Sequence, residues 1–218
     1  MQTKPNAMLF DLDGTLLETA KDLGNALNHV LLTKERPLVT YEQYRNIASD
    51  GAKGMLELGF GEELEFLDFE DLRQQFLTHY ENNICVDTIF FEGIETLLNE
   101  LNQQSIPWGI VTNKPEFLTQ KLIQSFPLLQ ACKVVISGDS LPERKPHPKP
   151  LLYAQEQLEI QSPNTWYIGD AQRDIEAANA ANMTSVVAEY GYLPSIQESH
   201  NWSADIHIRQ PLDLLAFL

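Results

Sequence analysis

The sequence has few cysteines and no long hydrophobic run. Only Cys85 and Cys132 are present among 218 residues, far apart and without the spacing of a metal-ligand pair. Two such cysteines indicate reduced thiols, and the polar run Met1 to Asn6 lacks the apolar stretch of a secretory signal. No apolar segment approaches the roughly 20 residues that span a bilayer. These absences predict a cytoplasmic protein with no membrane partner.

The sequence is also poor in basic residues. Lysine and arginine together number 15 against 31 acidic residues, which gives a formal net charge of −16. Such a charge repels phosphate backbones and anionic lipid, so a nucleic-acid partner is not expected. It does not identify a small substrate, because a metal ion can invert the charge of one local site. No feature of the sequence indicates an oligomeric state.

Short apolar runs alternate with helical patterns along most of the chain. The expected strands are Ala7–Phe10, Trp108–Val111, Val134–Ile136, Trp166–Ile168 and Ser185–Ala188, and the expected helices are Gly93–Asn102, Glu116–Ser125, Pro150–Leu158 and Ile175–Ala181. This alternation is typical of right-handed crossovers. It predicts an α/β fold with a doubly wound, mostly parallel, Rossmann-like sheet.

One long segment interrupts the alternation. Residues 17–86 show helical patterns and no convincing strand, with the glycine-rich stretch 50–54 expected as a loop. The segment is too long for an ordinary crossover, so it predicts an inserted all-helical cap. The discontinuous core would then comprise residues 1–16 and 87–218. Two linkers, near 16–20 and 83–93, would form a hinge that closes the cap over a site.

The first expected strand leads directly into two carboxylates. Alternate residues of an extended chain face the same side, so Asp11 and Asp13 can serve one site. Two nearby like charges resist ionisation without a cation or a proton between them. A polar Asp-Gly turn of a hairpin is the simpler explanation of the same residues.

Polar groups follow the other expected strands as well. They are Thr112 and Asn113 after the second strand, Lys145 in the proline-flanked loop after the third, and Asp170 and Asp174 after the fourth. Ligands of an open parallel sheet bind beyond the carboxyl ends of its strands. Taken singly, Lys145 would be a surface lysine and Asp174 a helix N-terminal charge. Their shared position at one edge predicts a site.

These motifs resemble those of the haloacid dehalogenase-like hydrolases. The four stretches Asp11–Thr15, Thr112–Asn113, Lys145 and Gly169–Asp174 match that family's four motifs in order, and the helical insert looks like its first cap type. The resemblance covers essentially the whole chain. Within the family, residues 145–151 and 188–192 are similar to phosphoglycolate phosphatases. Residues 49–55 and the tail around Trp202 look equally like N-acetylmuramic acid 6-phosphate phosphatases.

The resemblance implies a role for each motif residue. Asp11 would be the nucleophile that forms an aspartyl-phosphate, and Asp13 the general acid and base. Mg²⁺ would be held by Asp11, the Asp13 carbonyl and Asp170, and Asp174 would ligate through water or orient Lys145. Thr112 and Lys145 would stabilise charge on the phosphate oxygens.

Further residues are candidates for binding the phosphate or the rest of the substrate. In the core they are Gly14 and Thr15, through their backbone N–H groups, with Asn113 and Lys114; in the cap they are Asp50, Gly51 and Lys53. Lys114 could instead cap the following helix. Asp50 and Lys53 could equally belong to a solvated turn.

The expected activity is Mg²⁺-dependent hydrolysis of a small-metabolite phosphomonoester. Phosphoglycolate is the leading substrate and N-acetylmuramic acid 6-phosphate the alternative. A phosphonatase would use a cap lysine such as Lys53, and a sugar phosphomutase would use the same four motifs. Asp13 argues against a dehalogenase, because a halide needs no proton. A phospho-accepting signalling module needs no cap, and nothing specific favours a silent binding protein.

Overall fold

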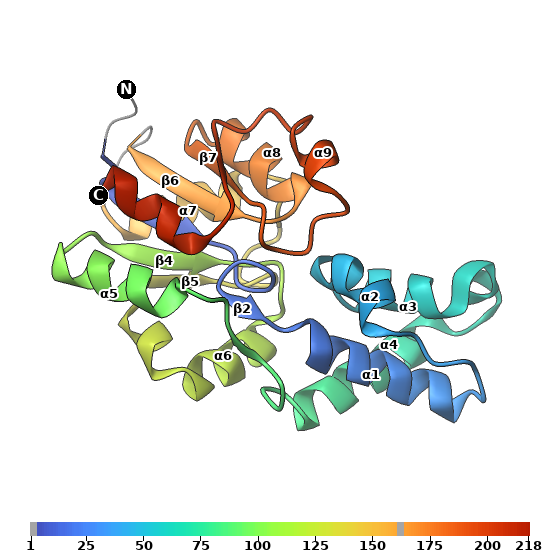
Figure 1. Ribbon diagram of the computed structural model, residues 1–218. Coiled ribbons are helices and arrows are strands. Elements are labelled where there is room, and N and C mark those ends of the chain that lie inside the picture. The colour runs from blue at the N-terminus through green and yellow to red at the C-terminus, as the bar shows by residue number, and fades with distance from the viewer. Residues whose placement is uncertain (1–3, 161–163) are drawn as a thin grey trace.

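A six-stranded parallel sheet forms the centre of the protein (Figure 1). This computed structural model describes residues 4–160 and 164–218. Residues 1–3 and 161–163, within the predicted core ranges, lie outside the described residues. The strands run in the order β5 (Val134–Ile136), β4 (Trp108–Val111), β1 (Ala7–Phe10), β6 (Thr165–Gly169), β7 (Thr184–Ala188) and β8 (Ile206–Ile208). Every neighbouring pair is parallel, which confirms the predicted doubly wound sheet.

Helices cover both faces of this sheet because its strands are apolar on both sides. In β1, Met8 and Phe10 face one cluster of buried side chains and Leu9 faces another. The first cluster includes α5 (Ile94–Gln103) and α6 (Glu116–Ser125). The second includes α7 (Lys149–Gln157) and α8 (Gln172–Ala180). The chain therefore winds in both directions from the central strand.

The strand order reverses at β1, which lies between β4 and β6. The connections after β1 and after β6 leave the sheet toward opposite sides, and this opens a crevice beyond the carboxyl ends of the strands. Asp11 follows β1 and Asp170 follows β6. The topology thus brings together two residues that are far apart in the sequence.

The predicted cap is a helical insert that lies to one side of the sheet (Figure 1). It comprises α1 (Ala20–Thr33), α2 (Tyr41–Tyr44), α3 (Gly51–Phe60) and α4 (Phe69–Asn82), with 3-10 segments at Arg45–Asp50 and Gly61–Phe66. Its apolar faces form their own buried cluster, which Leu118 and Tyr192 of the core complete. The linkers pair as a two-stranded antiparallel ribbon, β2 (Leu17–Glu18) with β3 (Ile89–Phe90).

Most predicted elements are found with bounds shifted by no more than three residues. The glycine-rich stretch 50–54 was expected as a loop, and that expectation is wrong. Gly51 has a φ of +61° and ends the preceding 3-10 segment, and α3 begins there. Met55 and Leu56 of α3 are fully buried in the insert, so packing outweighs the weak helix propensity of glycine.

The sequence pattern also misses β8, the short helix α9 (Ile196–Ser199) and the two-residue strands β2 and β3. Strand β2 lies within residues 17–86, where no strand was expected, and is recognisable only through its pairing with β3. Strand β8 alternates in burial over only three residues, too few to identify it from its pattern. Both cysteines are free thiols, as predicted. Within residues 4–160 and 164–218, no helix combines the length and apolarity that crossing a membrane requires.

Candidate active site

Asp11 and Asp13 leave β1 at the crevice, as their spacing predicts. Asp11 is buried, and its Oδ1 accepts a hydrogen bond from the N–H of Leu12 at 2.8 Å. Gly14 follows with a φ of +82°, and a side chain there would collide with the carboxylate of Asp170. The Asp-Gly turn therefore packs against the end of β6. It is not the tip of a simple hairpin.

Lys145 lies at the centre of a buried charge network. Its Nζ is 3.0 Å from Oδ1 of Asp11 and 2.8 Å from Oδ1 of Asp174, and it donates to the hydroxyl of Tyr167 at 2.7 Å. Burial works against the charged ammonium, but the charges of Asp11 and Asp174 raise its pKa above the ordinary value. Lys145 is therefore a cation held beside Asp11.

The side chain of Asn113 fixes the backbone of Lys145. Its Nδ2 donates to the Lys145 carbonyl at 2.9 Å, and its Oδ1 accepts from the Lys145 N–H at 3.1 Å. Thr112, the preceding residue, is 4% exposed, and its Oγ1 accepts from the N–H of Lys114 at 3.1 Å. The polar residues after β4 thus organise the loop that carries Lys145.

Three carboxylates converge beside this lysine. Asp11, Asp170 and Asp174 are all buried. One carboxylate oxygen from each residue lies within 4.8 Å of the oxygens from the other two. Burial raises the pKa of Asp170 to about 7, helped by the charges of Asp11 and Asp174. Burial likewise raises the pKa of Asp11 to about 6, although Lys145 opposes the shift. The cluster holds more negative charge than one lysine compensates.

Hydrogen bonds orient Asp170. Its Oδ1 accepts from the hydroxyl of Thr15 at 3.2 Å. Its Oδ2 accepts from the N–H of Tyr192 at 2.9 Å and from the hydroxyl of Ser49, in the insert, at 2.8 Å. The carboxylate is thus held by the first loop, by the segment after β7 and by the helical insert.

Asp13 has separate partners. Its Oδ1 accepts from the hydroxyl of Thr19 at 2.6 Å and lies 3.0 Å from Nζ of Lys114. Lys114 also donates to the hydroxyl of Tyr80 in α4 at 2.9 Å. Burial disfavours the ammonium of Lys114, but Asp13 raises its pKa above the ordinary value. Asp13 is therefore oriented at the boundary between core and insert.

The predicted cap residues reach the same cleft in different ways. Asp50 lies 2.8 Å from Nη1 of Arg173 at the start of α8, so it bridges insert and core. Gly51 and Lys53 line the cleft. The side chain of Lys53 is 74% exposed, and its Nζ lies 3.7 Å from Oε1 of Glu57. Asp50 and Lys53 thus do not share one environment.

The cleft between core and insert has a volume of about 510 Å³. Six of the 15 basic residues of this acidic chain line it: Lys53, Arg73, Lys114, Arg144, Lys145 and Arg173. Asp11 and Asp13 lie in the same lining. Basic side chains are therefore concentrated where a small anion would enter.

A family model for haloacid dehalogenase-like hydrolases matches residues 8–188, which is most of the chain. The chain belongs to the haloacid dehalogenase-like hydrolases. A phosphoglycolate phosphatase of Xanthomonas campestris is 41% identical over 210 residues, covering 96% of this chain and 95% of that protein. An N-acetylmuramic acid 6-phosphate phosphatase of Pseudomonas putida is 34% identical over 208 residues, covering 95% and 93%.

A solved structure shows the same fold. The crystal structure of a predicted phosphoglycolate phosphatase from Haemophilus somnus superposes with a TM-score of 0.87 at 26% identity and covers 99% of both chains. The resemblance to the haloacid dehalogenase-like hydrolases is thus confirmed in sequence and in fold. Proteins of this family that act as phosphatases generally use a divalent metal.

The cluster of three carboxylates fits a divalent metal ion. Carboxylate oxygens are the ligands that hard cations such as Mg²⁺ prefer. The raised pKa values of Asp11 and Asp170 arise from burial and mutual repulsion, which a cation would relieve. The donor set of this haloacid dehalogenase-like hydrolase is therefore suited to the metal that its family uses.

Besides Thr19, Tyr80 and Tyr192, four more residues outside the predicted set contact the site or the segment beside it. Tyr167 bonds Lys145, Ser49 bonds Asp170, Arg173 pairs with Asp50, and Arg45 donates to the carbonyls of Tyr190 and Gly191. Tyr167 had a sequence signal, because a tyrosine in a buried strand needs a partner for its hydroxyl. The contacts of Ser49 and Arg45 join segments far apart in the chain and leave no local signal.

Proposed function

We propose that this protein is a Mg²⁺-dependent phosphatase of small-metabolite phosphomonoesters. The observation that carries the proposal is that Asp11 and Lys145, an ion pair at 3.0 Å, line a cleft with several basic side chains, while the carboxylate of Asp170 lies beside that of Asp11. A phosphate dianion would be drawn there by charge and presented to Asp11. The phosphatases among the relatives support the same assignment.

Asp11 is the proposed nucleophile. Its carboxylate would attack phosphorus while the bond from phosphorus to the alcohol oxygen breaks, leaving an aspartyl-phosphate. Asp13 would give a proton to the departing alcohol and then take one from the water that hydrolyses the intermediate. Thr19 and Lys114, both bonded to Asp13 at its Oδ1, would hold that carboxyl group toward the leaving oxygen.

Other residues would bind the transferred phosphoryl group. Lys145 would balance the charge of Asp11 and Asp174 and stabilise the phosphoryl oxygens, together with Thr112. The backbone N–H groups of Gly14 and Thr15 would add hydrogen bonds. Asn113 would act on Lys145 through its backbone, and Lys114 through Asp13.

Asp11, Asp170 and the backbone carbonyl of Asp13 are the proposed ligands of Mg²⁺. Asp174 completes the carboxylate cluster, while its Oδ1 orients Lys145. When bound, the ion would neutralise charge between an anionic nucleophile and a phosphate dianion. Without it, burial and repulsion would protonate part of the cluster near neutral pH.

We further propose that residues 17–86 act as a cap over a core of residues 1–16 and 87–218. The ribbon of β2 and β3 would be the hinge, and the ion pair of Asp50 with Arg173 would break when the cap opens. Asp50, Gly51 and Lys53 would then contact the part of the substrate beyond the phosphate. Lys53 is also the cap lysine that the phosphonatase alternative would need.

Phosphoglycolate is the proposed substrate, because the phosphoglycolate phosphatases of Xanthomonas campestris and Xylella fastidiosa are 41% and 40% identical to this chain. N-acetylmuramic acid 6-phosphate is the second candidate on the strength of the relatives at 34% identity. Both compounds carry a carboxylate besides the phosphate, which suits the basic lining of the cleft. Arg144 and Arg73, which also pairs with Glu70 at 3.6 Å, line the cleft where they would contact that second anionic group.

Phosphate release from both compounds, with and without Mg²⁺, tests the proposal. We expect kcat/KM on phosphoglycolate to exceed that on N-acetylmuramic acid 6-phosphate at least tenfold, and the reverse order would favour the second candidate. Asp11→Asn should be inactive. Asp68→Asn is the matched control, since Asp68 is an exposed N-cap of α4 and asparagine caps helices equally well. No Mg²⁺-dependent release from any phosphomonoester would refute the function.

A further inference from the structure

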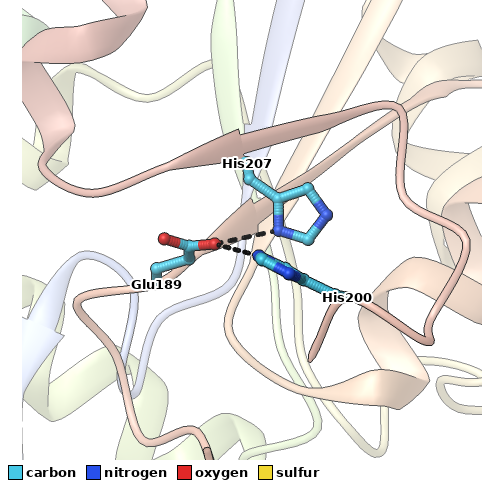
Figure 2. Close-up of side chains that lie close together, drawn as sticks. All are labelled: Glu189, His200 and His207. Atoms are coloured by element: carbon cyan, nitrogen blue, oxygen red, sulfur yellow. Dashed lines mark hydrogen bonds and ion pairs between the residues drawn. The ribbon is translucent and has the colours of Figure 1, made fainter. Parts of the chain in front are cut away.

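A cluster of two histidines and one glutamate lies outside the candidate active site. Figure 2 shows Glu189, His200 and His207 pointing toward one another from three segments. Glu189 follows β7, His200 follows α9, and His207 is the middle residue of β8. Nε2 of His200 lies 3.2 Å and Nδ1 of His207 lies 3.1 Å from the same oxygen, Oε1 of Glu189.

The sheet itself places two of these residues on one face. Val187 is in register with His207 across the parallel pair β7 and β8, and Glu189 lies two residues beyond Val187. Alternate residues of a strand share a face, so Glu189 and His207 point the same way. The N–H of Glu189 donates to the carbonyl of Ile208 at 2.9 Å, which extends the pairing to Glu189. Two of the three residues of the cluster are therefore held in place by the sheet.

The carboxylate of Glu189 lacks a strong charged partner. Its side chain is 5% exposed, and its two closest partners are ring nitrogens of histidines, which are in hydrogen-bond contact with Oε1. The nearest permanent cation is Arg209, whose Nε lies 3.9 Å from the other oxygen, Oε2, on a side chain that is 90% exposed. An ion pair at this distance and with this exposure contributes little to stabilising the carboxylate. A buried carboxylate in this setting favours a cation on Oε1.

We propose that Glu189, His200 and His207 form a binding site for a borderline transition-metal ion, with Zn²⁺ as the preferred ion. Each residue offers one ligand atom, and the three atoms lie within 4.8 Å of one another. With ligand bonds of about 2.0–2.1 Å, the edge of a zinc tetrahedron is about 3.3 Å. The distances of 3.1 and 3.2 Å to Oε1 are close to that edge.

The two candidate metal sites differ in chemistry. The active-site cluster offers only carboxylate oxygens, which suit Mg²⁺, whereas this site offers two imidazole nitrogens and one oxygen, which suit Zn²⁺, Co²⁺ or Ni²⁺. His200 is 60% exposed, so water would complete the fourth position.

An ion here would hold in place a core segment, residues 189–192, that is hydrogen-bonded to the insert. Glu189 begins the segment 189–192, in which Tyr190 and Gly191 accept hydrogen bonds from Arg45 of the insert. The N–H of Tyr192 donates to Asp170. A Zn²⁺ ion would tie the start of this segment to β8 and to the end of α9. We therefore expect slower amide exchange in 189–192 when the ion is bound.

Calorimetric titration of the whole protein with Zn²⁺, in excess Mg²⁺, tests the site. We expect wild type to bind one equivalent whose affinity falls at least tenfold in Glu189→Gln, His200→Asn and His207→Asn. His29→Asn and His79→Asn are matched controls, because these two histidines belong to helices α1 and α4 of the insert, away from the cluster. Their rings stack on each other with centroids 4.0 Å apart. Zn²⁺ binding by these two variants should equal that of wild type. Equal Zn²⁺ binding by wild type and the His200/His207 double variant would overturn the proposal.

Co²⁺ gives a second readout that needs no variant. Tetrahedral Co²⁺ with nitrogen ligands absorbs visible light much more strongly than octahedral Co²⁺ held by oxygens. We expect the strong spectrum in Mg²⁺-saturated wild type, lost on addition of Zn²⁺. A spectrum with nothing but the weak octahedral bands would overturn the proposal. This result comes from wild type alone, so it does not depend on whether the variants fold.

Discussion

The substitution Asp170→Asn should stabilise the metal-free protein at alkaline pH and abolish its response to Mg²⁺. In the folded chain the pKa of Asp170 is about 7, against the ordinary value of 3.8. Folding therefore binds a proton between these two values, and the contribution of this group to stability falls as the pH rises through that window. Asparagine carries no charge, so the substitution removes this loss of stability at high pH.

The size of the effect follows from the shift. Between pH 5 and pH 8 the ionisation of Asp170 would cost the folded state about 3 kcal/mol, at about 1.4 kcal/mol for each pKa unit. Asparagine keeps one oxygen for the N–H of Tyr192 and the hydroxyl of Ser49, and its amide can donate to Thr15. The loss of the second oxygen is the same at both pH values, so it cancels in the comparison.

Urea denaturation in EDTA at pH 5 and pH 8 measures this difference. We expect the free energy of unfolding of Asp170→Asn, relative to wild type, to rise by about 3 kcal/mol from the lower to the higher pH. Added Mg²⁺ at pH 8 should stabilise wild type and leave the variant unchanged. Parallel pH dependence of the two proteins in EDTA would refute the argument that burial and the neighbouring carboxylates raise the pKa of Asp170.

Three further predictions follow from other contacts. Asp11→Asn should lower the release of phosphate from an aryl phosphate at least roughly a thousandfold while the protein stays folded by circular dichroism, and activity within tenfold of wild type would exclude Asp11 as nucleophile. Arg45→Ala removes the donor to the carbonyls of Tyr190 and Gly191, so amide exchange in α2 and α3 should accelerate; unchanged exchange would contradict this role. Burial raises the pKa of Cys132 to about 11, so at pH 8 its alkylation should be on the order of a hundredfold slower than in urea, as timed by mass spectrometry.

Local patterns were sufficient to predict the scaffold of the site. The strands Ala7–Phe10, Trp108–Val111 and Val134–Ile136 are found at their predicted bounds, because each is a short apolar run with polar residues or turns around it. Parallel strands expose their carboxyl ends at one edge. Residues that directly follow strands, such as Asp11 and Asp170, could therefore be expected together without knowledge of the strand order.

The weaker predictions failed where packing outweighs local preference. Gly51 and Gly54 indicate a loop, yet they begin α3 because Met55 and Phe60 are buried against the other helices of the insert. Strand β8 is three residues long and is recognisable only through its pairing with β7. Neither outcome could be read from a window of neighbouring residues.

The amino-acid sequence by itself determined which chemical groups follow the strands and that a helical insert separates the first motif from the others. Only the tertiary structure decided that Lys145 lies between Asp11 and Asp174, that Ser49 reaches Asp170, and that Glu189 meets two histidines. The physical reason is the distance along the chain over which each kind of interaction acts. Periodicity and turn chemistry act over a few residues, whereas these contacts and the pKa shifts arise from burial and charge among segments that the folded chain brings together.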